Sequence, residues 1–200
     1  SNAQDIYLHS SPYCEAPRAF NNITMTDGIW SGNSVVPFRD GKQLNSPNFW
    51  LLFPGYRGGL PLGRDGGFDG NAIDTSIYYK LTLRMYIGKI QQPPNDPQPW
   101  DTVRLMWTDG DLGDFADGRC AVSNKIDPVQ GWNTYQIDLR TLGSNNNGTC
   151  STPINGWTGK VSGLRVMPIA DRENVEVKVD WARLTGDAGP TVPIRWANSG

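Results

Sequence analysis

The sequence contains a single histidine, His9, and this scarcity limits the chemistry that the chain can perform. A Ser-His-Asp or Cys-His arrangement uses an imidazole as its general base, and zinc sites built on histidine need several. No phosphate-binding P-loop, G-x-G-x-x-G fingerprint or G-x-S-x-G nucleophile motif occurs either. We therefore predict that the chain is not an enzyme. The alternative is a glycan-active hydrolase with two carboxylates, drawn from the aspartates of segment 109–117.

Long apolar runs and an excess of one charge are also absent. No stretch reaches the ~18 uninterrupted apolar residues that a membrane-spanning helix requires. The 18 basic and 20 acidic residues are well mixed and give a formal net charge of −2, whereas nucleic-acid binding calls for a concentrated basic face. The sequence thus predicts neither a membrane span nor a nucleic-acid partner.

Helical periodicity is the third absence. Glycine (23 residues) and proline (15 residues) together lie well above the ~12% of average usage in a chain of 200 residues. No long stretch repeats its apolar positions with the 3.6-residue period of a helix. We predict an all-β protein whose length suits one sandwich-sized module.

Several segments instead alternate apolar and polar residues, which is the pattern of a half-buried strand. The clearest is 76–87. Its predicted core residues are Ile77, Tyr79, Leu81, Leu83, Met85 and Ile87, and its opposite face carries Tyr78, Lys80, Thr82, Arg84 and Tyr86. Segments 102–108 and 132–139 alternate in the same way, with Trp107 and Tyr135 predicted to point into the core.

The C-terminal region 157–186 holds two strand-like runs. In 175–179, valines alternate with charged residues, and the run 161–169 is mostly apolar. A polar turn at 170–174 joins the two. We interpret the runs as the closing pair of one antiparallel sheet.

Three short motifs in this region resemble a known family: Trp-x-Gly at 157–159, Leu-Arg-Val-x-Pro at 164–168 and Val-x-Val-Asp-Trp-x-Arg-Leu at 177–184. With segments 72–87 and 131–142, they look like galactose-binding-like jelly-roll modules. These β-sandwiches serve as carbohydrate-binding modules on secreted polysaccharide-active proteins. The resemblance covers roughly residues 70 to 186 and consists mostly of core-packing positions.

The resemblance implies an antiparallel β-sandwich of the jelly-roll, galactose-binding-domain-like type. It also implies a non-catalytic carbohydrate-binding module of an extracellular or cell-surface, multidomain bacterial protein, with a polysaccharide or glycan as its partner. The alternative is a structural or protein-interaction domain on the same fold, since function resides in sites grafted onto folds.

A structural calcium ion is a further implication of the resemblance. In these families an aspartate of the final strand often helps to hold calcium, together with backbone carbonyls and an N-terminal acid. Asp180 matches that position, and Asp27 is the candidate N-terminal partner. Carboxylate oxygens are good calcium ligands. The alternative is that Asp180 hydrogen-bonds the neighbouring backbone.

The eight tryptophans are the strongest functional signal, because aromatic planes stack on sugar rings while planar polar groups bind the hydroxyls. One candidate site consists of loop residues, which are Trp30, Tyr56, Arg57 and Trp100. The competing site is the sheet face with Tyr78, Arg84 and Tyr86. The tryptophans on or beside strands are assigned to packing; they are Trp50, Trp107, Trp132, Trp157 and Trp181.

Three cysteines are present, and none forms a C-x-x-C pair of the kind that binds zinc. Cys120 and Cys150 both lie in polar, loop-like sequence on either side of strand 132–139. We predict a Cys120–Cys150 disulfide, which implies an oxidising compartment. Buried free thiols are the alternative. With those two paired, the third cysteine, Cys14, has no predicted disulfide partner.

The two ends of the chain differ in character from its middle. Residues 1–3 (Ser-Asn-Ala) are typical of an expression-tag scar, and 4–186 is the predicted β-sandwich module. Residues 187–200 are predicted to be a linker, with 192–196 resembling the first strand of an immunoglobulin-like or fibronectin-type module. Covalently linked neighbouring modules are therefore expected partners.

Overall fold

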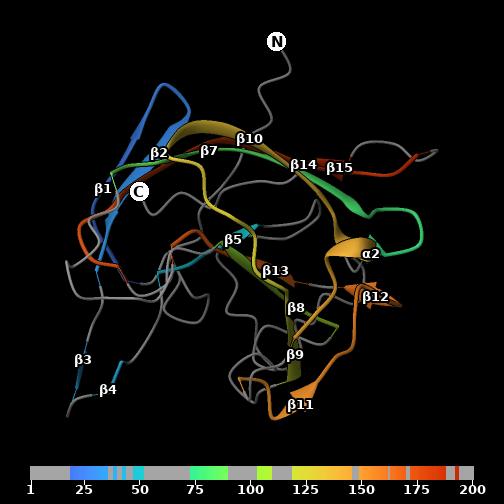
Figure 1. Cartoon of the computed structure of the whole chain (residues 1–200). Helices are drawn as coiled ribbons and strands as arrows, with labels where there is room; N and C mark the ends of the chain where they lie inside the picture. The colour runs from blue at the N-terminus through green and yellow to red at the C-terminus, as the bar shows by residue number, and fades with distance from the viewer. Residues whose placement is uncertain are drawn as a thin grey trace, which may run out of the picture.

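In the computed structural model, the described part of the chain is all-β and consists of stacked antiparallel sheets (Figure 1). The described residues are 19–35, 38–39, 42–43, 47–51, 73–89, 103–109, 119–145, 149–161, 163–169, 172–187 and 192–193. The all-β prediction is confirmed, and the stacking is consistent with a β-sandwich.

The larger sheet has six strands in the order β1-β2-β14-β7-β10, and β15 also pairs with β14. Its strands are β1 (Phe20–Thr26), β2 (Ile29–Ser34), β7 (Lys80–Ile87), β10 (Gly131–Asp138), β14 (Glu176–Thr185) and β15 (Val192–Pro193). Each of these pairs is antiparallel. The long central pairs β14–β7 and β7–β10 form the frame of the sheet.

The second sheet has five strands in the order β11-β9-β8-β13-β5. Its strands are β5 (Phe49–Leu51), β8 (Arg104–Thr108), β9 (Arg119–Val122), β11 (Thr152–Pro153) and β13 (Gly163–Met167). Only the β11–β9 pair of this sheet is parallel. The remaining elements are short: β3 (Phe38–Arg39) with β4 (Lys42–Gln43), β6 (Ile73–Asp74) with β12 (Lys160–Val161), and the helix α2 (Leu139–Leu142).

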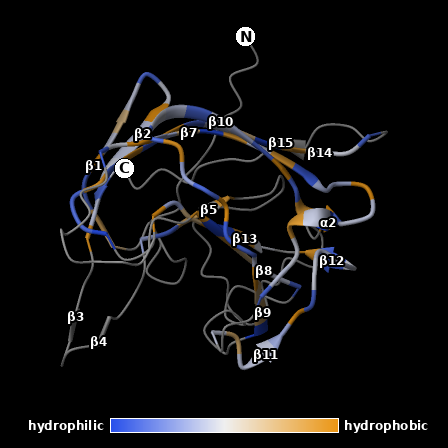
Figure 2. Ribbon diagram, in the orientation of Figure 1, coloured by the Kyte–Doolittle hydropathy of each residue, from blue (hydrophilic) through white to orange (hydrophobic). Residues whose placement is uncertain are grey.

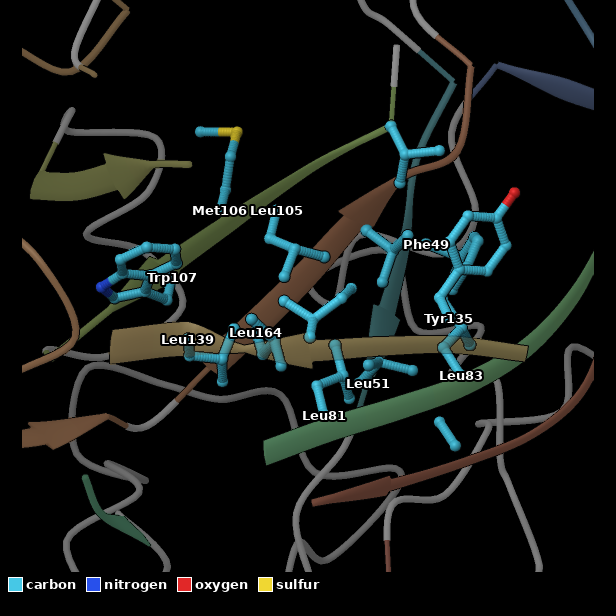
Figure 3. Close-up of a cluster of buried hydrophobic side chains, with 14 of the residues drawn as sticks. Phe49, Leu51, Leu81, Leu83, Leu105, Met106, Trp107, Tyr135, Leu139 and Leu164 are labelled. Carbon is cyan, nitrogen blue, oxygen red and sulfur yellow. The ribbon is translucent and has the colours of Figure 1, made fainter. Parts of the chain in front are cut away.

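The core lies between the two sheets, and Figure 3 shows side chains from both of them meeting there. Leu81, Leu83 and Tyr135 come from the six-stranded sheet, and Leu51 and Leu164 from the five-stranded sheet. All five are buried. Burial of one such aliphatic side chain stabilises the fold by about 1.5–3 kcal/mol, so this layer holds the sheets together.

The alternation expected from the sequence is confirmed in β7 and β10. It is not confirmed in β8, which is buried on both faces from Leu105 to Thr108. β7 buries every second residue from Leu81 to Ile87, and Trp107 of β8 and Tyr135 of β10 are buried as predicted. Hydrophobic and hydrophilic residues alternate along the six-stranded sheet in Figure 2. The polar set of β7, from Lys80 to Tyr86, therefore lies on the outer face of that sheet.

The predicted strand 76–87 begins later than expected, at Lys80. The residues before it form a turn, because Asp74 accepts hydrogen bonds from the backbone N–H and the hydroxyl of Ser76, at 2.9 and 2.6 Å. Ile77 is consequently 44% exposed, and its assignment to the core is wrong.

The two C-terminal runs do not pair with each other, so their interpretation as one closing pair is wrong. The first becomes β13, which pairs with β8 and β5, and the second becomes β14, which pairs with β2 and β7. Between them the chain crosses from one sheet to the other. Ser34 of β2 holds this crossing: its hydroxyl donates to the Arg172 carbonyl (2.5 Å) and accepts from the Val175 N–H (3.0 Å).

Trp30 packs inside the protein, and its predicted place in a loop is wrong. It lies in β2 and is 1% exposed, with ring centroids 5.0 Å from Phe20 and 5.9 Å from Phe49 of the other sheet. Gly32 leaves room for the indole, since a Cβ atom there would lie 3.1 Å from its ring. Trp30 is thus a core residue and cannot stack on a ligand.

The predicted Cys120–Cys150 disulfide is confirmed. Cys120 lies in β9, and Cys150 precedes β11, which pairs with β9. Both cysteines are buried. Between them the chain leaves the five-stranded sheet, forms β10 in the six-stranded sheet and returns. The disulfide therefore closes a loop that includes strands of both sheets.

Two described stretches after β14, 186–187 and 192–193, stay close to the sheet. The Tyr79 hydroxyl donates to Asp187 at 2.5 Å, and β15 pairs with β14. The division of the chain into a module and a linker from 187 onward stays a prediction. Across the described segments, no helix is long and apolar enough to cross a membrane.

Candidate functional site

A β-bulge in β14 places two consecutive side chains on the outer face of the six-stranded sheet. Val179 pairs with Met85 and Trp181 with Arg84, so Asp180 is the extra residue. The buried positions of β14 are Val177, Val179, Ala182 and Leu184. The alternation thus shifts by one at the bulge. Asp180 and Trp181 both lie on the same face as Arg84, and Trp181 is half-buried and also packs against the core.

The antiparallel register aligns these residues with the outward side chains of β7 and β10. Tyr86 lies opposite Trp132 on one side and Lys178 on the other, and Arg84 lies opposite Trp181. Directly opposite residues of antiparallel strands share a face of the sheet. We name this surface the aromatic face, and its residues are Arg84, Tyr86, Trp132, Lys178, Asp180, Trp181 and Arg183.

Trp132 is the exposed ring at the centre of these contacts. It is 37% exposed, and its ring centroid lies 5.7 Å from that of Tyr86 and 5.0 Å from the guanidinium carbon of Arg84. Lys178 Nζ lies 5.4 Å from the centroid of Tyr86. Cations at such distances are attracted by the ring quadrupole. The rings and cations therefore hold one another in a defined arrangement without ligand.

Arg84 and Asp180 supply polar groups beside the rings. Arg84 Nε lies 3.5 Å from Asp180 Oδ2, and Arg84 Nη1 donates to Thr134 Oγ1 at 3.4 Å. The Arg84 and Asp180 side chains are 38% and 39% exposed. A guanidinium has five donors and a carboxylate about four acceptor positions, so both retain hydrogen-bonding capacity for a ligand.

Of the predicted sheet-face site, Arg84 and Tyr86 lie together, but Tyr78 does not join them. Tyr78 precedes β7 and is half-buried, and its carbonyl accepts a hydrogen bond from Trp157 Nε1 at 2.8 Å. At 3.3 Å per residue, about 20 Å of chain separates it from Arg84. Tyr78 thus belongs to the packing at the opposite end of the strand.

The predicted loop site is not brought together by the described residues. Trp30 is the member of that set that the structure describes, and it is buried between Phe20 and Phe49. Tyr56, Arg57 and Trp100 lie outside the described residues. Their role in ligand binding stays a prediction.

The predicted calcium ligands are Asp180 and Asp27, and they have different surroundings in the structure. Asp180 pairs with Arg84, and Asp27 lies exposed in the β1–β2 turn with a φ of 53°. Within the ranges that the structure describes, no three or more His, Cys, Asp or Glu side chains form a group that could hold a metal ion. The calcium ion, with Asp180 and Asp27 among its ligands, stays a prediction.

Sequence patterns missed four residues of the aromatic face. Trp132 and Trp181 are assigned to packing, which holds in part for the half-buried Trp181, and Lys178 and Arg183 are not singled out. A signal for Trp132 is present, since inward-facing Tyr135 sets an alternation that turns Trp132 outward. For the residues beyond the bulge in β14, the valines of 175–179 predict the opposite face.

A second charged cluster lies at the far end of the same sheet. Asp187 accepts hydrogen bonds from the Tyr79 hydroxyl and the Lys80 ammonium, and the Arg140 guanidinium carbon lies 3.5 Å from the centroid of Tyr79. Arg140 also forms a two-pronged pair with Asp138. Because each of these charges has a partner inside the cluster, we interpret it as a structural tie between β7, α2 and the end of β14.

Asp138 gives this tie a defined pH dependence. Hydrogen bonding from the Arg140 side chain lowers the pKa of Asp138 from 3.8 to about 2. Since the folded pKa lies below the unfolded value, its contribution is complete above about pH 4 and is lost as the pH falls toward 2. We expect Asp138→Asn to flatten the decline of the unfolding free energy over this window, measured by urea denaturation. If the unfolding free energy of the variant fell as steeply with decreasing pH as that of the wild type, this prediction would be wrong.

Asp109 gives no support to the alternative that two carboxylates of segment 109–117 hydrolyse a glycan. Both of its oxygens accept hydrogen bonds from Arg119, each at 2.6 Å. Arg119 thus occupies both oxygens of Asp109 in a two-pronged pair. The other aspartates of the set, Asp111, Asp114 and Asp117, lie outside the described residues.

Comparison with models of protein families and with curated proteins finds no match for this chain. No relative therefore identifies it as a galactose-binding-like module. The structure defines the class: an all-β protein with stacked antiparallel sheets, the Cys120–Cys150 disulfide and an aromatic, charged outer face.

Proposed function

We propose that the protein is a non-catalytic carbohydrate-binding module of an extracellular or cell-surface protein, and that its sheets form a jelly roll of the galactose-binding type. Its ligand is a polysaccharide or glycan that lies on the aromatic face. The observation that supports this is an exposed tryptophan beside a tyrosine and an arginine–aspartate pair on one sheet surface. The disulfide supports the location, because such bonds persist in oxidising compartments.

The aromatic face offers the two kinds of contact that a sugar requires. The apolar C–H face of a pyranose ring stacks on Trp132, whose ring is accessible. The hydroxyls around the same ring then meet the donors of Arg84 and the acceptors of Asp180. The existing contacts between Trp132, Tyr86 and Arg84 preorganise the surface, which lowers the ordering cost of binding.

A protein partner is the competing explanation, because Trp, Tyr and Arg also dominate protein interfaces. The core of such interfaces is depleted in charged residues. On the aromatic face every ring instead has a charged neighbour: Arg84 beside Trp132, Lys178 beside Tyr86 and Arg183 beside Trp181. This interleaving of rings with charges favours a hydroxyl-rich ligand over an apolar protein surface.

Trp132→Ala tests the proposal. We expect affinity for the bound glycan to fall at least about tenfold, because truncation of a central aromatic hot spot costs about 2 kcal/mol or more and 1.4 kcal/mol is tenfold. The ligand is first found on a glycan array, and affinity is then measured by isothermal titration calorimetry. Each array is run in calcium and in EDTA, so that loss of signal in EDTA would reveal a metal.

Ile77→Ala provides the matched control, since Ile77 is 44% exposed but lies in the turn before β7. It should leave the affinity unchanged. Equal affinities of wild type and Trp132→Ala would show that the glycan does not bind at Trp132 on the aromatic face. A silent array, with folded protein verified by circular dichroism, would overturn carbohydrate binding and favour a protein partner.

A further inference from the structure

Arg183 occupies a distinct position on the aromatic face. It lies opposite Thr82 of β7, next to Trp181, and its side chain is exposed. Its guanidinium carbon lies 5.5 Å from the centroid of the Trp181 ring. An arginine beside an aromatic ring can direct its planar fork of N–H donors toward solvent, where the fork matches a carboxylate or sulfate in two-pronged fashion.

Arg183 also differs from the neighbouring cations in its ion pairing. Lys80 pairs with Asp187, Arg84 with Asp180 and Lys178 with Glu176. Among the residues that the structure describes, no carboxylate pairs with Arg183. Within the described part of the chain, the aromatic face therefore carries one guanidinium without a carboxylate partner, although the whole chain is slightly acidic, with a net charge of −2.

We propose that the ligand is an acidic polysaccharide and that Arg183 binds its anionic group. This inference depends on the carbohydrate binding proposed above and names the class of glycan. The group is the carboxylate of a uronic acid or a sulfate ester, since each presents at least two anionic oxygens that a guanidinium can bind with paired N–H donors. A neutral part of the same chain stacks on Trp132.

The register sets the distance between the two contacts. Trp132 aligns with Tyr86 and Arg183 with Thr82, which are four positions apart on β7, and β10 and β14 flank β7. With about 3.3 Å per residue along a strand and about 4.8 Å between strands, the two Cα atoms lie about 16 Å apart. Arg84 and Trp181 lie between them. The geometry thus fits an extended oligosaccharide of several units and not a single sugar.

Three polymers test this class: a uronic-acid polysaccharide, the same polymer with its carboxylates chemically reduced to alcohols, and a sulfated polysaccharide. Binding to the full chain is measured by isothermal titration calorimetry at low and high salt. We expect an acidic polymer to bind about tenfold more tightly than the reduced one, as one charge-assisted hydrogen-bonded contact allows. The difference should shrink at high salt, because exposed charges are screened.

Arg183→Gln should abolish the preference for the acidic polymer and leave binding of the reduced polymer intact. The matched control is Lys125→Gln, which removes the same charge from an exposed residue between β9 and β10 and should change neither. Equal binding of reduced and acidic polymers, with Trp132→Ala weakening both, would overturn the role of Arg183 and keep the carbohydrate-binding proposal. Equal losses in Arg183→Gln and Lys125→Gln would show non-specific charge attraction. Absence of binding to all three polymers and to the array would overturn both proposals.

Discussion

Replacement of Gly186 by alanine is expected to destabilise the protein by more than about 3 kcal/mol, at the upper end of what overpacking costs. A Cβ atom at Gly186 would lie 1.7 Å from the backbone oxygen of Ile77. The obstructing atom belongs to the main chain, so no side-chain rotation can relieve the overlap. Either the end of β14 or the turn before β7 must move.

The movement would also break contacts on both sides of Gly186. The Thr185 carbonyl accepts a hydrogen bond from the Tyr79 N–H at 2.9 Å, and Asp187 N–H donates to the Tyr79 hydroxyl at 3.1 Å. Tyr79 is itself buried in the core. A displaced residue 186 therefore weakens the pairing at the end of the long central strands and the polar tie beyond it.

Gly28→Ala is the matched control for this prediction. Gly28 has a φ of +76°, but no atom lies within 4 Å of a Cβ built there. Its replacement should cost only the backbone strain of the left-handed region, about 1–2 kcal/mol. Free energies of unfolding in urea compare the two variants. Equal destabilisation by both would show that the contact with Ile77 is not the cause.

The inward faces of the central strands were predictable because they depend on local alternation. Leu81, Leu83 and Met85 are buried as the period of two requires, and so are Trp107 and Tyr135. The register can then be deduced for outward residues of the same strand. Trp132 belongs to the aromatic face by this rule, although its type suggests packing.

The partners of each strand were not predictable in the same way. The runs that became β13 and β14 are neighbours in sequence, yet they lie in different sheets. Pairing over such a crossing depends on contacts distant in sequence, such as those of Ser34 with residues 172–175, which are 138 and 141 residues apart in the two hydrogen bonds. A local pattern of apolar residues gives no information about contacts between residues so far apart in the sequence.

The outward position of Trp181 depends on the bulge in β14. Extending the alternation of Val177 and Val179 puts Trp181 in the core, whereas the burial of Ala182 and Leu184 shows that the phase has shifted. The apolar spacing in the sequence does change phase at this point, from odd to even positions. Such a shift within one strand is the sign of an inserted residue, and Asp180 is that residue.

Removal of the Cys120–Cys150 disulfide is the second large effect that we expect. The bond spans 30 residues, and the chain-entropy model gives about 3–4 kcal/mol of stabilisation for a loop of this length. The loop contains β10, the outer strand of the six-stranded sheet, while both cysteines belong to the side of the five-stranded sheet. A variant with Cys120→Ala and Cys150→Ala should therefore lose stability by this amount and fray first at β10 and β11.

Because both cysteines are buried, the rate at which the disulfide is reduced provides a second, kinetic test of the same bond. Since Cys120 and Cys150 are at most 2% exposed, a reductant should reach the disulfide only when the protein opens. In a Cys14→Ala background, protein thiols are labelled after timed exposure to dithiothreitol and its removal, and they should appear slowly in buffer and quickly in urea. Urea unfolding of the fully reduced protein should then match that of the double alanine variant. Rapid reduction in buffer would show that a reductant reaches the bond without opening of the protein. A reduced protein as stable as the oxidised one would show that the bond does not stabilise the fold.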